Sequence, residues 1–77
     1  MSGFSYPIAL TPAKSTSGFY VTSRDVPELL THGNDIPQAL LSARDALAMI
    51  FFVYNAEHRP IPAPSQPQEG EWLVSPL

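Results

Sequence analysis

Large apolar residues alternate with smaller or polar ones near the start of the chain, and this alternation predicts a first β-strand. The large side chains recur two residues apart, at Phe4, Tyr6, Ile8 and Leu10. They therefore lie on one face of an extended segment. Pro7 falls on the opposite face and has no backbone N–H, so its position must face outward or begin the strand pairing. We expect a strand over residues 4–10 with its apolar face buried.

Two further strands are expected before the helix described below. Residues 18–23 are rich in aromatic and β-branched side chains, which are typical of strands. The polar segment 11–17 before them contains a proline and predicts a hairpin loop. Residues 25–28 predict a turn, because proline presets φ and aspartate can bond to its own backbone. Residues 29–32 then predict a short third strand that ends at a glycine.

The clearest helix signal begins at Asp35. Asp35 is a good N-cap, and Gln38 lies three residues later, as in a capping box. Pro37 falls in the first turn, where a missing N–H costs nothing. Apolar residues then recur at spacings of three and four, at 36, 39, 40, 43, 47, 50, 51 and 54. This pattern predicts one long helix with a buried face, from Ile36 to about Ala56.

The segment after the helix is rich in proline, which prevents helix and favours an extended path over residues 60–64. A stiff connector to the last strand is one interpretation of this segment, and a ligand for an aromatic-groove domain is the other. Residues 72–74 predict a short final strand. Trp72 at its start fits either an interface anchor or the plug of a small core.

The expected order of elements is β-β-β-α-β, an α+β fold in a single domain that spans residues 1–77. Three antiparallel strands present one apolar face, one long helix covers it, and a fourth strand returns after the helix. A right-handed crossover through the helix would place that fourth strand parallel to a neighbour. A chain of this length buries only a modest core.

The predicted helix carries apolar residues on two sides, which indicates a protein–protein interface. With Ala43 at the centre of the core side and about 100° per residue, Leu41, Ala48 and Phe52 fall on the opposite side. A helix that is apolar on two sides is normally buried on both. A second copy or another protein would cover the outer side, so a homo-oligomer is expected, with Trp72 as a further interface candidate. The alternative is that these are scattered exposed apolar residues.

Composition and charge narrow the function classes. Charged residues make up 14% of the chain and the formal net charge is −3, against about 25% charged residues in a typical soluble domain. The four basic residues are dispersed, which disfavours nucleic acid as a partner. The longest uninterrupted apolar stretch, residues 46–54, is far shorter than the about 20 residues that span a bilayer. We expect a soluble, cytoplasmic protein with no membrane partner.

The sequence contains no recognisable catalytic arrangement. The first predicted strand carries no carboxylate, whereas a two-metal nuclease needs several that converge on one site. His32 and His58 fit no metal-ligand spacing, and the chain has no cysteine. We therefore expect no enzymatic activity, no metal and no cofactor. His32 is expected at the surface near a strand end, and His58 is placed to complement the helix dipole.

Several short motifs, in order along almost the whole chain, resemble one known family. Y-P-I-A-L at 6–10 is similar to its first strand, and G-F-Y-V-T at 18–22 with D-V-P at 25–27 is similar to its second strand and D-L-P turn. L-T-H-G-N-D at 30–35 resembles its V-T-Q-G-D-T entry to the helix. The alanines and leucines of 39–47 and the P-I-P-A-P-S of 60–65 complete the pattern. The family is the HicB-like antitoxins of bacterial type II toxin–antitoxin modules.

The resemblance implies a degenerate ribonuclease-H-like fold without catalytic carboxylates. It implies that the protein neutralises a HicA-like toxin, a small mRNA-cleaving ribonuclease, by binding it. Members usually carry a C-terminal DNA-binding domain, which is not expected within this chain because the sequence stops just after the last strand. Either that domain was cut off or the protein is a stand-alone version. A stand-alone oligomeric regulator or scaffold without a toxin partner is the alternative function.

One position departs from the family pattern. The family often has glycine directly after the D-L-P turn, where this chain has Glu28. If the family uses glycine there because the backbone has a positive φ, Glu28 should strain or remodel the turn, at a cost of about 1 kcal/mol.

Overall fold

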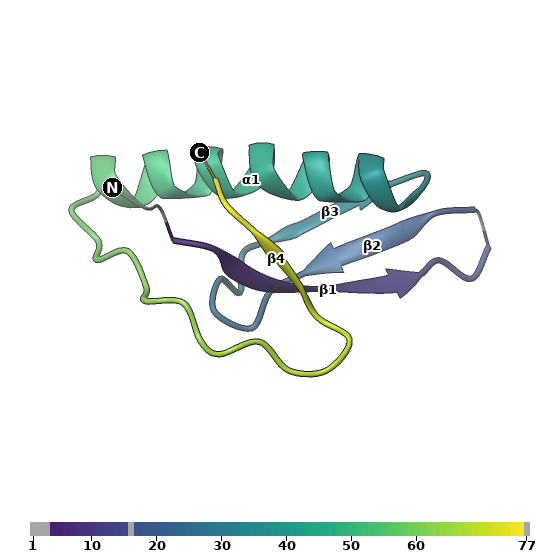
Figure 1. Cartoon of the computed structure of the whole chain (residues 1–77). Helices are drawn as coiled ribbons and strands as arrows, with labels where there is room; N and C mark the ends of the chain where they lie inside the picture. The colour runs from purple at the N-terminus through teal and green to yellow at the C-terminus, as the bar shows by residue number, and fades with distance from the viewer. Residues whose placement is uncertain (1–3, 16, 77) are drawn as a thin grey trace.

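The computed structural model describes residues 4–15 and 17–76, and in these it shows four strands and one helix (Figure 1). The elements are β1 (Tyr6–Pro12), β2 (Phe19–Thr22), β3 (Leu30–Gly33), α1 (Ile36–Ala56) and β4 (Trp72–Val74). The α+β class, the element order and both ends of the helix are confirmed. The first strand begins and ends two residues later than predicted, so the hairpin loop is shorter.

The four strands form one sheet in the order β3-β2-β1-β4, and every neighbouring pair is antiparallel. The prediction that the last strand runs parallel to a neighbour is therefore wrong. The reason is the connector, which we define as residues 57–71. It runs back along the molecule from the end of α1 before β4 begins (Figure 1). This second reversal of direction makes β4 antiparallel to β1.

β1 uses one half of its length for each neighbour. Residues 6–8 pair with β4, and residues 9–12 pair with β2. The carbonyl of Pro7 accepts a hydrogen bond from Ser23 Oγ at 3.4 Å, just past the end of β2. The N–H and the C=O of a residue in an antiparallel strand point to the same side of that strand. The N–H that Pro7 lacks would therefore point toward Ser23, and pairing with β2 begins only at Ala9. The proline is therefore tolerated in an inner strand.

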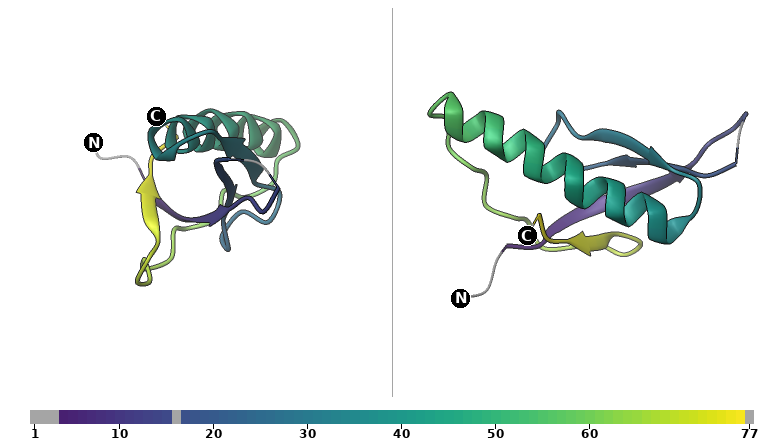
Figure 2. Two further views of the ribbon diagram at one scale, coloured as in Figure 1. Left: turned by 90° about the vertical axis from the view of Figure 1, so that its right-hand side faces the viewer. Right: turned by 90° about the horizontal axis from the view of Figure 1, so that it is seen from above.

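The core lies between α1 and the sheet (Figure 2). α1 contributes Ala39, Ala43 and Leu47, and the strands contribute Tyr6, Ile8, Val21 and Val74. Small residues on the helix let it approach β3 closely. A Cβ on Gly33 would collide with the backbone of Ala39 and lie 2.8 Å from its Cβ. Position 33 must therefore be glycine, because any Cβ there would collide with Ala39. This close contact determines how α1 packs against the sheet.

Both ends of α1 are capped. Gln38 N donates to Asp35 Oδ1 at 2.8 Å, as the predicted N-cap requires. The Gln38 side chain reaches one residue further back than in a capping box and accepts from Asn34 N at 2.6 Å. At the other end, Arg59 N donates to Tyr54 O at 2.8 Å and His58 N to Asn55 O at 3.1 Å. This is a Schellman motif with His58, at φ 59°, in the position usually taken by glycine.

Candidate protein-binding surface

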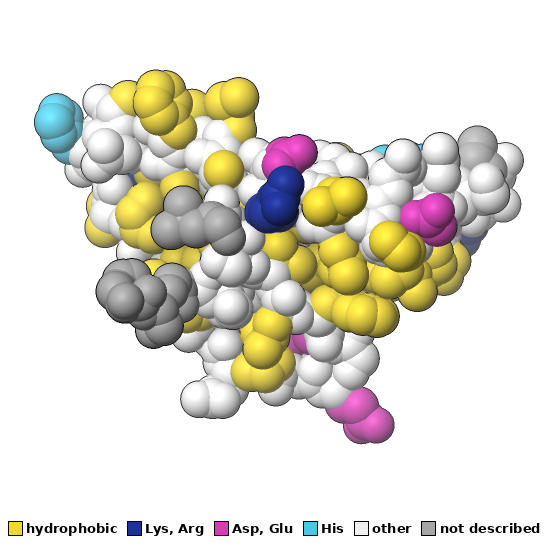
Figure 3. Space-filling view, turned by 45° about the horizontal axis from the view of Figure 1, so that its top comes forward, with side chains coloured by type: hydrophobic (Ala, Val, Ile, Leu, Met, Phe, Trp, Pro, Cys, Tyr) yellow, Lys and Arg dark blue, Asp and Glu magenta, His cyan; other side chains and the backbone are white. Residues whose placement is uncertain are grey.

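The outer face of α1 is apolar and exposed. The side chains of Leu41 and Phe52 are 54% and 72% exposed, and Ala48 between them is also exposed. The predicted helical phase is thus confirmed in its burial pattern, and the use of these residues in an interface stays a prediction. Figure 3 brings this side of the molecule forward and shows hydrophobic side chains at several places along it.

A single ion pair interrupts the apolar outer face of α1. Arg44 Nη2 lies 3.5 Å from Asp45 Oδ1, and both side chains are at least half exposed. One basic side chain beside an acidic one is visible near the middle of the surface in Figure 3. Neighbouring residues on a helix point about 100° apart. The two charges therefore flank the apolar row of Leu41, Ala48 and Phe52.

The edge strand β4 carries two further exposed apolar side chains, and consecutive residues of a strand point to opposite faces of the sheet. Trp72 is 41% exposed and Leu73 is 56% exposed. Trp72 is absent from the buried core, so it is not a core plug. Sequence reasoning did not single out Leu73, nor Met49 and Leu30, which are 65% and 70% exposed. Their apolar character was visible in the sequence, but their exposure depends on which neighbours the fold provides.

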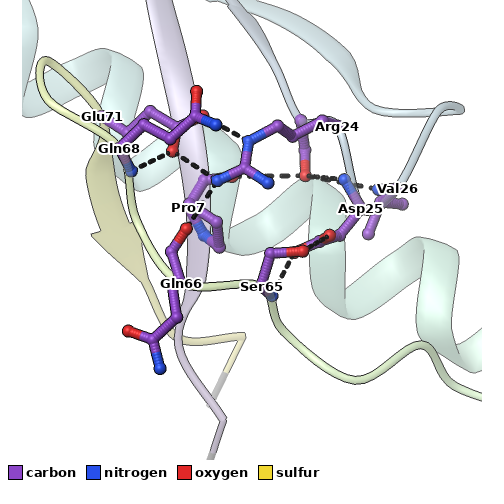
Figure 4. A network of polar contacts seen from close by, with 9 residues as sticks. Pro7, Arg24, Asp25, Val26, Ser65, Gln66, Gln68 and Glu71 are labelled. Atoms are coloured by element: carbon purple, nitrogen blue, oxygen red, sulfur yellow. Dashed lines mark hydrogen bonds and ion pairs between the residues drawn. The ribbon is translucent and has the colours of Figure 1, made fainter.

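The connector is held against the strands by a polar network (Figure 4). Arg24, just after β2, makes a bidentate contact with Glu71 at 2.8 and 2.9 Å and donates to the carbonyl of Gln66 at 2.6 Å. Asp25 accepts from the backbone N–H of Ser65 at 2.8 Å and from its hydroxyl. The hydrogen bond from Arg24, and then the one from the backbone N–H of Gln68, lower the pKa of Glu71. The interpretation of the proline-rich segment as a connector is consistent with this packing.

A second polar cluster joins the end of α1 to the turn before β3. Tyr54 Oη donates to Glu28 Oε1, and Arg59 Nη2 lies 2.9 Å from Glu28 Oε2. The Arg59 guanidinium also stacks over the Tyr54 ring, 3.9 Å from its centroid. The hydrogen bonds from Tyr54, and then from Arg59, lower the pKa of Glu28 to about 2.

The structure shows no left-handed backbone at Glu28, so the strain expected for a residue in a glycine position is absent there. Among the described residues, His58 is the one non-glycine residue with a positive φ. Glu28 therefore needs no left-handed backbone, and its side chain instead binds Tyr54 and Arg59. The sequence could not show this, because Tyr54 lies 26 residues away.

The described residues contain no group of three or more His, Asp or Glu side chains placed to hold a metal ion. His32 is exposed at the sheet surface, as expected, and lies against the Tyr20 ring with 5.5 Å between centroids. Arg24, Arg44 and Arg59 each form an ion pair with a carboxylate. These arginines are therefore partly neutralised by the protein's own acids.

α1 is also long and apolar enough to cross a membrane, judged by length and composition alone. One such helix is weak evidence, because the mostly buried core helix of a soluble protein passes the same test, although only 17% of the most apolar window of α1 is buried. The helix is therefore weak support for a membrane segment, and the expected lack of a membrane partner stays a prediction.

The comparison with known families matches almost the whole chain. Residues 5–76 match the family described as the HicB_like antitoxin of bacterial toxin–antitoxin systems. The chain belongs to the HicB-like antitoxins. The motif-based family assignment from the sequence is thereby confirmed, and the ribonuclease-H-like label stays a prediction.

Curated HicB antitoxins are similar over most of this chain. Antitoxin HicB of Escherichia coli K12 is 42% identical over 60 residues, which cover 78% of this chain and 43% of that protein. Antitoxin HicB 1 of Photorhabdus laumondii is 39% identical over 72 residues, which cover 94% of this chain and 45% of that protein. The matched region is therefore less than half the length of each of these relatives.

Proposed function

We propose that this HicB-like domain neutralises a HicA-like, mRNA-cleaving toxin by protein–protein contact in the cytoplasm. The observation that carries this proposal is the exposed apolar surface on α1 and β4 in a domain of an antitoxin family. Large exposed apolar side chains on a small protein favour binding to another protein. The candidate contact residues are Leu41, Ala48, Phe52 and Trp72.

The structural roles of the acidic side chains support a function in binding and not in catalysis. The acids Glu28, Asp25 and Glu71 hold the turn and the connector in place, and Asp35 caps α1. These four carboxylates therefore have structural partners, and β1 at the centre of the sheet carries no acid. RNA cleavage by the purified domain that survives repurification and stops with a chelator would contradict the proposal.

Direct binding of this domain to nucleic acid is not proposed. Three of its four basic residues pair with carboxylates of the same domain. Binding to phosphates would have to break these pairs, and four dispersed positive charges release few counterions. Sequence-selective DNA binding at nanomolar concentration by residues 1–77 would overturn this part of the proposal.

Co-expression with a HicA-like toxin encoded beside the gene of this chain tests the function. We expect the wild-type domain to restore growth and to elute as a complex with the toxin. Trp72→Asp tests the contact on β4, and Phe52→Asp tests the contact on α1. Leu30→Asp is the matched control for Phe52→Asp, because Leu30 on β3 is 70% exposed and Phe52 is 72% exposed. A folded wild-type domain that neither binds the toxin nor restores growth would refute the proposal. That result would favour the alternative of a stand-alone oligomeric regulator.

A further inference from the structure

We propose that residues 59–74, which we call the strap, detach from the rest of the fold and dock again as one unit, held closed chiefly by Arg24 and Asp25. The strap consists of most of the connector together with β4 (Figure 1). Detachment displaces Trp72, one of the candidate toxin contacts. This consequence for Trp72 rests on the proposed function, whereas the detachment itself does not.

The strap contributes little to the hydrophobic core. Among the described residues, Val74 is the one side chain of the strap in that core. The other core side chains come from β1, β2, α1 and the loop between β2 and β3, all outside the strap. Trp72 and Leu73 are 41% and 56% exposed. Because burial of apolar surface is the main source of stability, the core can stay packed when the strap detaches.

Polar contacts from the loop between β2 and β3 hold the middle of the strap (Figure 4). Arg24 donates both to the carbonyl of Gln66 and to the carboxylate of Glu71. Asp25 accepts from the backbone N–H and from the hydroxyl of Ser65. Two neighbouring residues therefore bind the strap at three positions, the last of them directly before β4.

The rest of the strap is held by contacts that are individually weak. Arg59 pairs with Glu28 at 2.9 Å, and both side chains are nearly half exposed. Tyr6 Oη donates to the carbonyl of Pro62 at 2.6 Å, and β4 pairs with only three residues of β1. Exposed ion pairs and single hydrogen bonds each stabilise a fold weakly. Detachment of the strap therefore needs less free energy than unfolding of the core.

The strap is expected to move as one unit because its interior is stiff. Pro60, Pro62 and Pro64 restrict the backbone to an extended path. Before β4, Glu71 Oε1 accepts from the N–H of Gln68 at 2.7 Å, and Glu71 N donates to the carbonyl of Gln68 at 3.0 Å. The carboxylate that binds Arg24 thus also closes this turn, so loss of one contact weakens the others.

Native-state amide hydrogen exchange, followed by nuclear magnetic resonance without toxin, measures detachment. The amides of Ser65 and Glu71 report on the strap, because both donate hydrogen bonds when it is closed. The amide of Leu47, which is buried on α1, reports on unfolding of the core. We expect Ser65 and Glu71 to share one protection factor, about tenfold or more below that of Leu47.

Two variants separate detachment from global unfolding. Arg24→Gln should lower the protection of Ser65 and Glu71 by one common factor of about tenfold, because it removes charged hydrogen bonds. It also lowers the protection of Leu47, since both openings start from the folded state that it destabilises. Asp35→Ala is therefore the discriminating variant. It removes the N-cap of α1 and should lower the protection of Leu47 by about fivefold, with the strap amides unchanged.

Two further variants control for these effects. Ser65→Ala removes only the hydroxyl contact with Asp25, and should lower the protection of Glu71 by about threefold. Arg44→Gln is the matched control for Arg24→Gln, because Arg44 also forms an ion pair, but with Asp45 outside the strap. It should leave the strap amides unchanged. Circular dichroism checks that each variant is folded.

Equal protection of the strap amides and Leu47 in the wild type, or lower strap protection in Asp35→Ala, would overturn separate detachment. An effect of Arg24→Gln on Glu71 but not on Ser65 would overturn the single unit. These results leave toxin neutralisation to its own test, because no toxin is present. A toxin that contacts Trp72 should raise the protection of the strap amides when added. Unchanged protection with bound toxin would overturn the link to Trp72 and not the detachment.

Discussion

Replacing Gly33 with alanine should destabilise the fold strongly, because it adds one methyl group where α1 meets β3. The new Cβ would lie 2.8 Å from Ala39 Cβ, 0.6 Å short of an ordinary contact of 3.4 Å, and even closer to the backbone N and Cα of Ala39. Backbone in the first turn of a capped helix cannot rotate away as a flexible side chain can. The helix must therefore shift as a unit or the strand must bend.

The expected loss follows from known costs of overpacking. An added methylene in a close-packed site costs about 1–3 kcal/mol, and collision with backbone places Gly33→Ala at the upper end, about 2–3 kcal/mol. The total stability of 77 residues is about 4–12 kcal/mol. For a domain of this size we therefore expect Tm to fall by about 10–20 °C. Thermal and urea unfolding followed by far-ultraviolet circular dichroism, with Trp72 fluorescence as a second probe, measures this loss.

Gly70→Ala is the matched control, because it makes the same chemical change where no atom lies within 4 Å of the new Cβ. Gly70 has φ +88°, so alanine there costs only conformational strain, about 1 kcal/mol. The double variant Gly33→Ala/Ala39→Gly should not recover, because the colliding N and Cα remain. A Gly33→Ala protein as stable as the Gly70→Ala control would refute the close approach of α1 to β3.

Three further changes test the ends of α1 and the connector. His58→Gly should raise the free energy of unfolding by about 0.5–1 kcal/mol, because glycine adopts φ 59° without a Cβ penalty; urea unfolding measures it. Glu28→Gln should lower Tm above about pH 5 and matter progressively less as the pH falls from 4.5 toward 2. The reason is that the folded pKa of Glu28 lies near 2, below its ordinary 4.5, and Tm measured against pH checks it. Tyr6→Phe should cost about 1 kcal/mol in urea unfolding, because it removes the 2.6 Å hydrogen bond from Tyr6 Oη to the carbonyl of Pro62.

Each of these predictions has an outcome that contradicts it. A less stable His58→Gly protein would mean that the imidazole makes a stabilising contact that outweighs its backbone strain. A stability difference for Glu28→Gln that stays constant down to pH 2 would mean that this carboxylate is not paired in the folded state. Wild-type stability in Tyr6→Phe would place the connector away from β1.

The sequence by itself determined which segments are helix and strand and which side of the helix is buried. Asp35 accepts a hydrogen bond from the backbone N–H of Gln38. The helix ends at Ala56, shortly before Pro60, the first proline of the connector. Capping and hydrophobic periodicity act between residues within four positions of each other, so they can be read along the chain. The candidate interface of Leu41, Ala48 and Phe52 followed from the same periodicity, and these side chains are exposed.

Only the tertiary structure decided the direction of β4 and the partners of the polar residues. The connector is long enough to return in either direction, and contacts such as Asp25 with Ser65, 40 residues apart, hold it in the observed path. Glu28 illustrates the same limit, since its environment consists of Tyr54 and Arg59 brought close by packing. The energy of such contacts depends on distances between segments far apart in the chain, and local sequence patterns carry no information about those distances.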